Sequence, residues 1–248
     1  MTRPPAASSQ PTRAVAALIL ADPPLPGACL PGLDPMLGPE GCARLQEVLL
    51  RRAAAWAQEV APGRALVAVA PPPADPQPTA GLLPPARPPH AEAGDLAEVV
   101  TEGTVVFPQR GGHPGERLIA AVEDAFDRAG TGPLLVAGTG VPRLSAPHAA
   151  AALADLAEGC DATFGPALDG GFYLAGLAGS YAATFTLPAE AWESSDLLTG
   201  VLARARDNGL ELGLLRYERE LRGPLDVRAL LADPLSPPDV VGVLRELV

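Results

Sequence analysis

The chain has 248 residues, enough for one α/β domain with a full hydrophobic core. All 18 of its basic residues are arginine, and the absence of lysine excludes Schiff-base catalysis by lysine and a phosphate-loop lysine. The formal net charge of −11 argues against nonspecific binding to nucleic acid or to anionic membranes. No apolar run reaches the ~20 residues that cross a bilayer. We therefore expect a cytoplasmic protein that binds neither nucleic acid nor membranes, and whose oligomeric state the sequence leaves open.

The predicted core consists of small and aliphatic side chains, because hydrophobic residues make up 48% of the chain but aromatic residues only 4%. Such a core suits a sheet covered by helices that are rich in alanine and leucine. The three cysteines are Cys29, Cys42 and Cys160. Their odd number and the lack of a C-x-x-C pair argue against a disulfide framework and a zinc ribbon. We expect buried free thiols.

The chain is predicted to begin with a disordered tail over residues 1–12, which are rich in Pro, Ser and Ala. The apolar run Ala14–Ala21 predicts a strand that is buried on both faces. A loop rich in Pro and Gly follows over Asp22–Pro39, and loops of this length are usually functional or disordered. The spacing of apolar residues then predicts a helix over Glu40–Val60.

The middle of the chain continues the alternation of strands and helices. Strands are predicted over Arg64–Ala70, Thr104–Phe107 and Leu134–Ala137, and a helix with proline at its start is predicted over Pro114–Ala129. The prolines of Pro71–Pro89 exclude regular structure there.

The C-terminal part begins with a helix over Ala146–Glu158, for which Ser145 is the expected N-cap. The remaining predicted elements are a strand pair (Asp161–Phe164 and Phe172–Leu177), a helix (Ser195–Asn208), a strand (Leu212–Tyr217), a helical turn after Asp226 and a closing segment (Pro237–Val248). This pattern predicts a single α/β domain over residues 13–248, with a mostly parallel sheet and a ligand crevice at the carboxyl ends of its strands.

The most distinctive motif is GPALDGGFYLAGL, Gly165–Leu177. With three other blocks, it resembles the nucleotide-diphospho-sugar transferase-like proteins called radical-SAM/selenodomain-associated transferases, also known as arsenosugar-biosynthesis glycosyltransferases. The 2-phospho-L-lactate guanylyltransferases are more distant relatives. The resemblance runs from about Ala14 to Leu230 and implies a glycosyltransferase-A type fold, a Rossmann-like three-layer sandwich.

The other blocks keep the frame of that family and depart from its chemistry. The first loop, DPPLPGACLPGL (Asp22–Leu33), has Asp22 where the family has its first lysine, and Leu30-Pro31-Gly32 where it has K-T-R. In QRGGHPGERL (Gln109–Leu118), His113 replaces an acidic residue. In GTGVP (Gly138–Pro142), Gly140 stands where the family has the aspartate expected to hold a divalent metal. The WESSDLL and PLDV blocks match only loosely.

Two carboxylates are candidates for the chemistry that the resemblance implies. Asp169 is the candidate catalytic residue, as a base, a metal ligand or a contact to the acceptor. The alternative is a turn residue that accepts backbone N–H bonds from Gly170 and Gly171. Asp226 is the candidate metal ligand, and an N-cap before Val227–Leu231 explains it equally well.

The candidate ligand contacts are glycines that let peptide N–H groups approach phosphates, and the planar fork of an arginine. They are Gly27, Gly112, Arg117, Gly138, Thr139, Gly170 and Gly171. For Arg117 a solvated helix face is the alternative. His113 is expected to be a solvated loop residue, Trp192 a core or edge aromatic, and His148 an exposed residue near a helix start.

Three functions remain open at this point. The first is a transferase that moves a sugar from a nucleotide-sugar donor. The second is an inactive relative that binds a partner or metabolite, and the third is a nucleotidyltransferase of the cofactor-biosynthesis type. The resemblance implies Mg²⁺ or Mn²⁺ and no organic cofactor, but the loss of a carboxylate predicts that the metal is held weakly.

Two expectations concern geometry. Gly27, Gly112, Gly140 and Asp169 are expected to converge on one cleft. A nucleotide diphosphate is expected to bind weakly with Mg²⁺, because Gly140 offers no carboxylate and the loop from Asp22 to Gly32 offers no cation. The diphosphate would then meet Asp22 and Asp169 without the charge that normally offsets them. On that reasoning Gly140→Asp strengthens Mn²⁺-dependent nucleotide binding, and Leu30→Lys with Gly32→Arg strengthens it further.

Overall fold

A seven-stranded sheet is the framework of the computed structural model, which describes residues 14–72, 96, 99–130 and 132–248. The predicted tail over residues 1–12 lies outside the described residues. So does the predicted irregular stretch Pro71–Pro89, apart from residues 71 and 72.

The strands confirm the predicted, mostly parallel sheet. They are β1 (Ala16–Ala21), β2 (Ala65–Val69), β3 (Val105–Pro108), β4 (Leu134–Gly138), β5 (Ala162–Pro166), β6 (Phe172–Leu177) and β7 (Leu212–Leu214). Their order is β3-β2-β1-β4-β6-β5-β7. Strand β6 runs antiparallel to β4 and β5, and the other neighbours are parallel. As predicted, β1 lies between β2 and β4 and is parallel to both.

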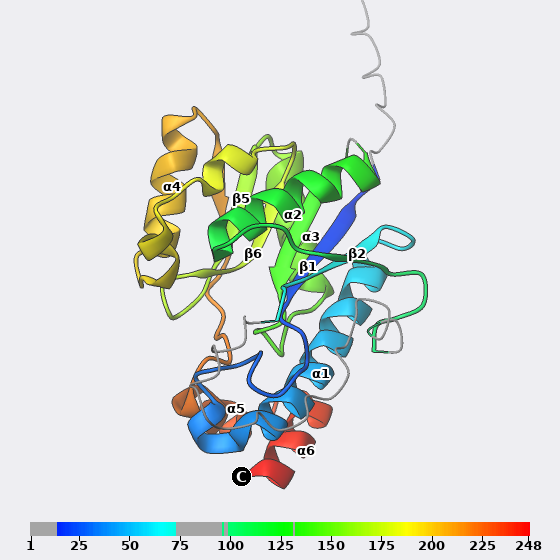
Figure 1. Cartoon of the computed structure of the whole chain (residues 1–248). Helices are drawn as coiled ribbons and strands as arrows, with labels where there is room; N and C mark the ends of the chain where they lie inside the picture. Colours follow the sequence, from blue (N-terminus) through cyan, green and yellow to red (C-terminus); the bar gives the residue numbers. More distant parts are fainter. Residues whose placement is uncertain (1–13, 73–95, 97–98, 131) are drawn as a thin grey trace, which may run out of the picture.

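Helices cover both faces of the sheet, so the fold has three layers (Figure 1). The helices are α1 (Asp34–Val60), α2 (Pro114–Ala129), α3 (Ala146–Ala157), α4 (Leu197–Asp207), α5 (Pro224–Ala232) and α6 (Pro238–Leu247), with 3-10 helices η2 (Ala182–Phe185) and η3 (Ala189–Glu193). Alternate residues of β1 point to opposite faces. Ala17 and Ile19 pack with α1 and α3, whereas Leu18 packs with α2 and α4.

A separate apolar cluster joins α5 and α6 to the first part of α1, at one end of the molecule (Figure 1). Cys29 and Cys42 lie in this cluster and are buried, as expected, while Cys160 is partly exposed. Burial raises the pKa of the Cys29 thiol to about 12, so this sulfur stays protonated at neutral pH.

Helix α1 is divided by Gly38, whose backbone is not helical (φ 69°), and the part that follows it confirms the helix predicted from about Glu40 to Val60. The short part from Asp34 was not predicted. Two other local predictions were wrong in detail. The last strand ends at Leu214, before the predicted Tyr217. His148 is only 4% exposed rather than at the surface, because its ring packs edge-on against Tyr173. Its Nε2 lies 3.1 Å from Oε1 of Glu218.

Candidate functional site

A cleft of about 550 Å³ opens at the carboxyl ends of β1 and β4. Because β6 is antiparallel to β4, its first residues lie at the same edge and also line the cleft. The side chains that line it and carry polar or aromatic groups are Asp22, Gln46, Gln109, Arg117, Thr139, Phe172, Tyr173, Trp192, Glu220 and Arg222. The crevice therefore lies where the strand order predicted it.

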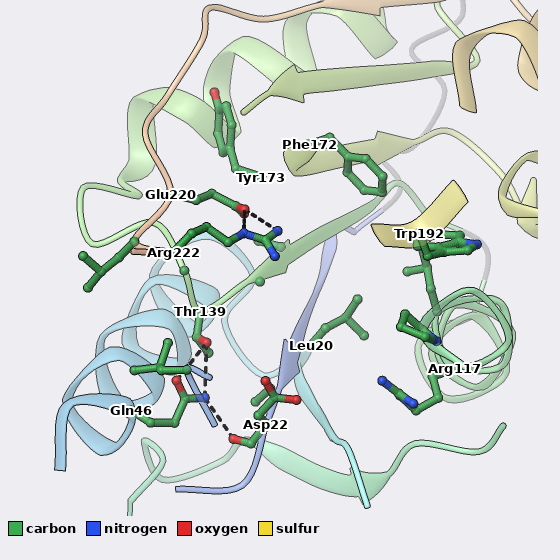
Figure 2. A pocket seen from close by; sticks show the side chains of 18 of the residues that line it. Leu20, Asp22, Gln46, Arg117, Thr139, Phe172, Tyr173, Trp192, Glu220 and Arg222 are labelled. Atoms are coloured by element: carbon green, nitrogen blue, oxygen red, sulfur yellow. Dashed lines mark hydrogen bonds and ion pairs between the residues drawn. The ribbon is translucent and has the colours of Figure 1, made fainter. Parts of the chain in front are cut away.

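Gln46 holds the two central strand ends together. It is 1% exposed, and its Nε2 donates to the backbone oxygen of Asp22 at 2.9 Å and lies 3.3 Å from Oγ1 of Thr139 (Figure 2). These bonds satisfy a buried amide and fix the loops that follow β1 and β4. The floor of the cleft is thus rigidly positioned.

The first turn of α2 forms one wall. His113 is the N-cap residue of this helix, and its Nδ1 accepts the Gly115 N–H at 3.2 Å, so its role is in capping. Trp192 packs directly on Gly115, where a side chain would overlap the indole. It is an edge aromatic, as predicted, because it packs against the core and also lines the cleft. The His113 cap and the Trp192 contact position the N-terminal end of α2, with its partial positive charge, beside the cleft.

Arg117 extends from α2 towards Asp22 (Figure 2). Within the described residues, its side chain makes one hydrogen bond, from Nη1 to the Gly112 oxygen at 3.4 Å, and no ion pair. The guanidinium therefore keeps donors that a ligand anion can use.

A second cation, Arg222, enters the cleft from the segment between β7 and α5. Its Nη2 lies 2.6 Å from Oε2 of Glu220, and its Nε lies 2.9 Å from Oδ2 of Asp169 (Figure 2 shows the pair with Glu220). Glu220 is only 8% exposed, and burial raises the pKa of its carboxyl while Arg222 lowers it. Burial alone would lower the pKa of Arg222, but the neighbouring carboxylates outweigh it and raise that pKa. Arg222 therefore stays charged.

Asp22 also lies in the cleft. Within the described part of the chain, its carboxylate makes no hydrogen bond and no ion pair. Water reaches this side chain, but the surrounding walls limit its hydration and raise its pKa, against the lowering effects of Arg117 and Arg222. A carboxylate with a raised pKa and a free oxygen can accept a proton in a reaction.

The predicted site residues fall into two groups. Arg117, Gly138, Thr139 and Gly140 line the cleft. The residues that do not line it are Gly27, Gly112, Asp169, Gly170, Gly171 and Asp226. Of the four residues expected to converge on the cleft, only Gly140 lines it, so the prediction was wrong for Gly27, Gly112 and Asp169. Their loops contribute neighbouring residues instead.

Asp169 occupies the tight turn between β5 and β6. Its Oδ1 accepts the Gly171 N–H at 3.1 Å, as the turn interpretation predicted, whereas the Gly170 N–H bonds to the Ala167 oxygen. Its other oxygen contacts Arg222. Both oxygens are therefore engaged, and Asp169 acts on the cleft through Arg222.

Asp226 lies in the first turn of α5, which begins at Pro224. Its Oδ2 accepts the N–H groups of Arg222 (3.2 Å) and Gly223 (3.0 Å), and its Oδ1 lies 2.8 Å from Nη1 of Arg219. It borders a separate, smaller cavity of about 120 Å³. The carboxylate is thus committed to the helix start.

The expectation that Asp22 and Asp169 lack an offsetting charge was wrong, because Arg222, from a segment remote in sequence, pairs with Asp169 and lowers the pKa of Asp22. Sequence reasoning also missed Glu220 and Gln46. Their signal is weak: Glu220 and Arg222 only precede the loosely matched PLDV block, and Gln46 stands on an ordinary helix.

Comparisons with known proteins support the fold. Residues 85–192 match the model of a family described as an uncharacterized protein conserved in bacteria (DUF2064). No curated protein sequence matches the chain. A proposed nucleotide-diphospho-sugar transferase from Desulfovibrio desulfuricans G20 superposes with a TM-score of 0.74 at 22% identity, over 94% of both chains.

A homolog of Mycobacterium tuberculosis Rv0371c, from Mycobacterium sp. strain JC1, superposes with a TM-score of 0.51 at 16% identity. The match covers 95% of this chain and 99% of that one. The chain therefore shares the α/β fold of these two solved structures, in agreement with the fold that the sequence motifs predicted. No helix within the described residues is long and apolar enough to cross a membrane.

Proposed function

We propose that the cleft binds a nucleotide-sugar by its phosphates, and that the chain is a glycosyltransferase-like protein acting on, or descended from one acting on, such a donor. The observation that carries this proposal is the pair of guanidinium groups, Arg117 and Arg222, that line one cleft at the carboxyl edge of the sheet. Arginine forks match phosphate oxygens in geometry and charge.

The remaining wall chemistry fits the other parts of such a ligand. Phe172 and Trp192 offer aromatic surface for a base or a sugar ring. The peptide groups of Gly138, Thr139 and Gly140, at the end of β4, also line the cleft, where backbone N–H groups can approach phosphates.

In the transfer reaction an acceptor hydroxyl attacks the anomeric carbon of the sugar, and the bond to the diphosphate breaks. Arg117 and Arg222 would offset the negative charge that develops on the leaving diphosphate. Asp22 would take the proton of the acceptor hydroxyl, because its carboxylate is free and lies in the cleft. This role replaces the one expected for Asp169, which is held by Arg222.

A second candidate is an inactive relative that only binds its ligand. It is favoured by the engagement of Glu220 and Asp169 with Arg222, which leaves few groups free for chemistry. Thermal shift with a panel of nucleotide-sugars and nucleoside triphosphates tests ligand binding, since a ligand at 100 times its Kd adds about 2.7 kcal/mol of stability.

Release of the nucleoside diphosphate in the presence of acceptors then separates the candidates. Release with the wild type and its loss in Asp22→Asn supports the transferase. Binding without release supports the inactive relative, and pyrophosphate release from a triphosphate supports a nucleotidyltransferase. If no nucleotide raises the melting temperature, the proposed function is wrong.

A further inference from the structure

The residues around the cleft do not fit a divalent metal. Within the described part of the chain, no three His, Cys, Asp or Glu side chains are grouped so that they can hold one. Of the carboxylates near the cleft, Glu220 and Asp169 are both turned to Arg222. Magnesium ions depend on a small number of carboxylate ligands, so the pairing of these oxygens with arginine leaves little for the ion.

At Gly140, where the resembled family has its metal-binding aspartate, a carboxylate from another segment lies close by. A Cβ built on Gly140 would lie 3.7 Å from both Cδ and Oε1 of Glu220, so this carboxylate faces the position where the resembled family has its metal-binding side chain. The Leu221 N–H donates to the Gly140 oxygen at 2.7 Å and ties the two segments together. Glu220 therefore presents its carboxylate from a different segment of the chain.

The cation paired with the Glu220 carboxylate is the guanidinium of Arg222, not a metal ion. Arg222 is fixed at its guanidinium by Glu220 and Asp169. Its backbone is fixed by the Asp226 carboxylate, which accepts its N–H, and by Gly32, which packs so closely on the Arg222 carbonyl that a side chain would overlap it. The Nη1 group has no partner within the described residues, and Arg222 lines the cleft. Two N–H donors of a fixed cation are thus free for an anion.

We propose that the guanidinium of Arg222 takes the place of the divalent metal, so that the cleft binds the diphosphate part of its ligand without a metal ion. Glu220 and Asp169 are positioning residues for this cation. The inference rests on the proposed function, because it assumes that the ligand carries phosphate groups. An arginine is a permanent cation with fixed geometry, so the site needs no metal to be assembled.

The test measures binding of inorganic pyrophosphate and of UDP by isothermal titration, with EDTA and with added Mn²⁺. We expect the wild type to bind both ligands with the same Kd under the two conditions. Arg222→Gln should weaken binding about tenfold or more, the effect of losing one charge-assisted hydrogen bond. Arg44→Gln is the matched control, because Arg44 pairs with Glu246 outside the cleft, and it should bind as the wild type does.

Two further readouts separate ligand binding from a role in folding. Arg222→Lys keeps the charge and should recover part of the affinity. Arg222→Ala frees Glu220 and Asp169, so any residual pyrophosphate binding should become dependent on Mn²⁺. Wild-type binding that requires Mn²⁺, or Arg222→Gln binding equal to wild type, would overturn the inference but leave the proposed function standing. Absence of binding under both conditions would refute both.

Discussion

Tyr173 lies directly against Gly165 on the neighbouring strand, so closely that a side chain at Gly165 would overlap the phenol ring. Both residues belong to the most distinctive sequence motif. Gly170 in the same motif has φ +93° and packs on the Ser195 carbonyl, where a side chain would also overlap. Packing and backbone conformation, rather than contact with a ligand, therefore account for these glycines.

Gly165→Ala should destabilise the protein by about 1–3 kcal/mol, the usual cost of overpacking a core. For a chain of this size each kcal/mol lowers the melting temperature by about 2–4 °C. Calorimetry or circular dichroism would measure the change. Gly242→Ala in α6 is the control, because a Cβ there meets nothing within 4 Å, and it should leave stability unchanged or raise it. Equal melting temperatures for the two variants would contradict the packing explanation.

Asp22→Asn should stabilise the protein at neutral pH. Because the walls of the cleft raise the pKa of Asp22, the folded state favours the protonated carboxyl. Its contribution to stability is therefore full at acid pH and is lost as the pH rises through the raised pKa. The gain from Asp22→Asn should fade as the pH falls, and urea unfolding at intervals from about pH 4 to about pH 8 would measure it.

Glu116→Gln is the control, because the pKa of Glu116 is shifted in the opposite direction to that of Asp22. The Gly112 N–H donates to the Glu116 carboxylate at 2.8 Å and, with His113, lowers its pKa. This carboxylate stabilises the folded state above its ordinary pKa range, and the contribution is lost as the pH falls through the lowered pKa. Glu116→Gln should therefore be less stable than wild type at neutral pH and equal to it in acid. A common pH trend for both variants would contradict the assignment.

Asp226→Ala should lower stability by about 0.5–2 kcal/mol, because the N–H groups at the start of α5 lose their acceptor. Asp226→Asn keeps an acceptor oxygen and should lose less. Neither variant should change how the protein responds to Mn²⁺ in a thermal shift assay, since Asp226 borders a separate cavity. Loss of Mn²⁺ stabilisation in Asp226→Ala alone would instead make this residue a metal ligand.

Gly140→Asp should create Mn²⁺ binding, and more strongly when combined with Arg222→Ala. The new side chain fits, because its Cβ would meet only ordinary contacts with Glu220, and the two carboxylates would then face each other. In the wild-type background Arg222 competes with the ion for Glu220. Titration with Mn²⁺ would measure the affinity of the wild type, of Gly140→Asp and of the double variant, which should increase in that order. Equal affinity of the single and double variants would contradict the competition by Arg222. Gly32→Arg cannot be added, since Gly32 packs on the Arg222 carbonyl.

The sequence by itself determined most of the helices and strands, because these follow from local patterns, and the family resemblance supplied the expected fold. The apolar run before Asp22 predicted the central strand β1, and Pro114 and Gly130 bracket a helix whose bounds were predicted to the residue. The motif Gly165–Leu177 predicted the strand pair β5–β6. Each of these signals lies within a short stretch of chain.

Only the tertiary structure decided which charges meet in the cleft. Arg222 and Glu220 reach Gly140 because the segment before α5 crosses the carboxyl ends of β1 and β4, and no periodicity along the chain encodes that crossing. The sequence showed that the first loop lacks three cations of the resembled family, but it could not show that a distant segment supplies Arg222 to the same cleft. Electrostatic energy depends on distances in space, and those follow from packing rather than from position in the sequence.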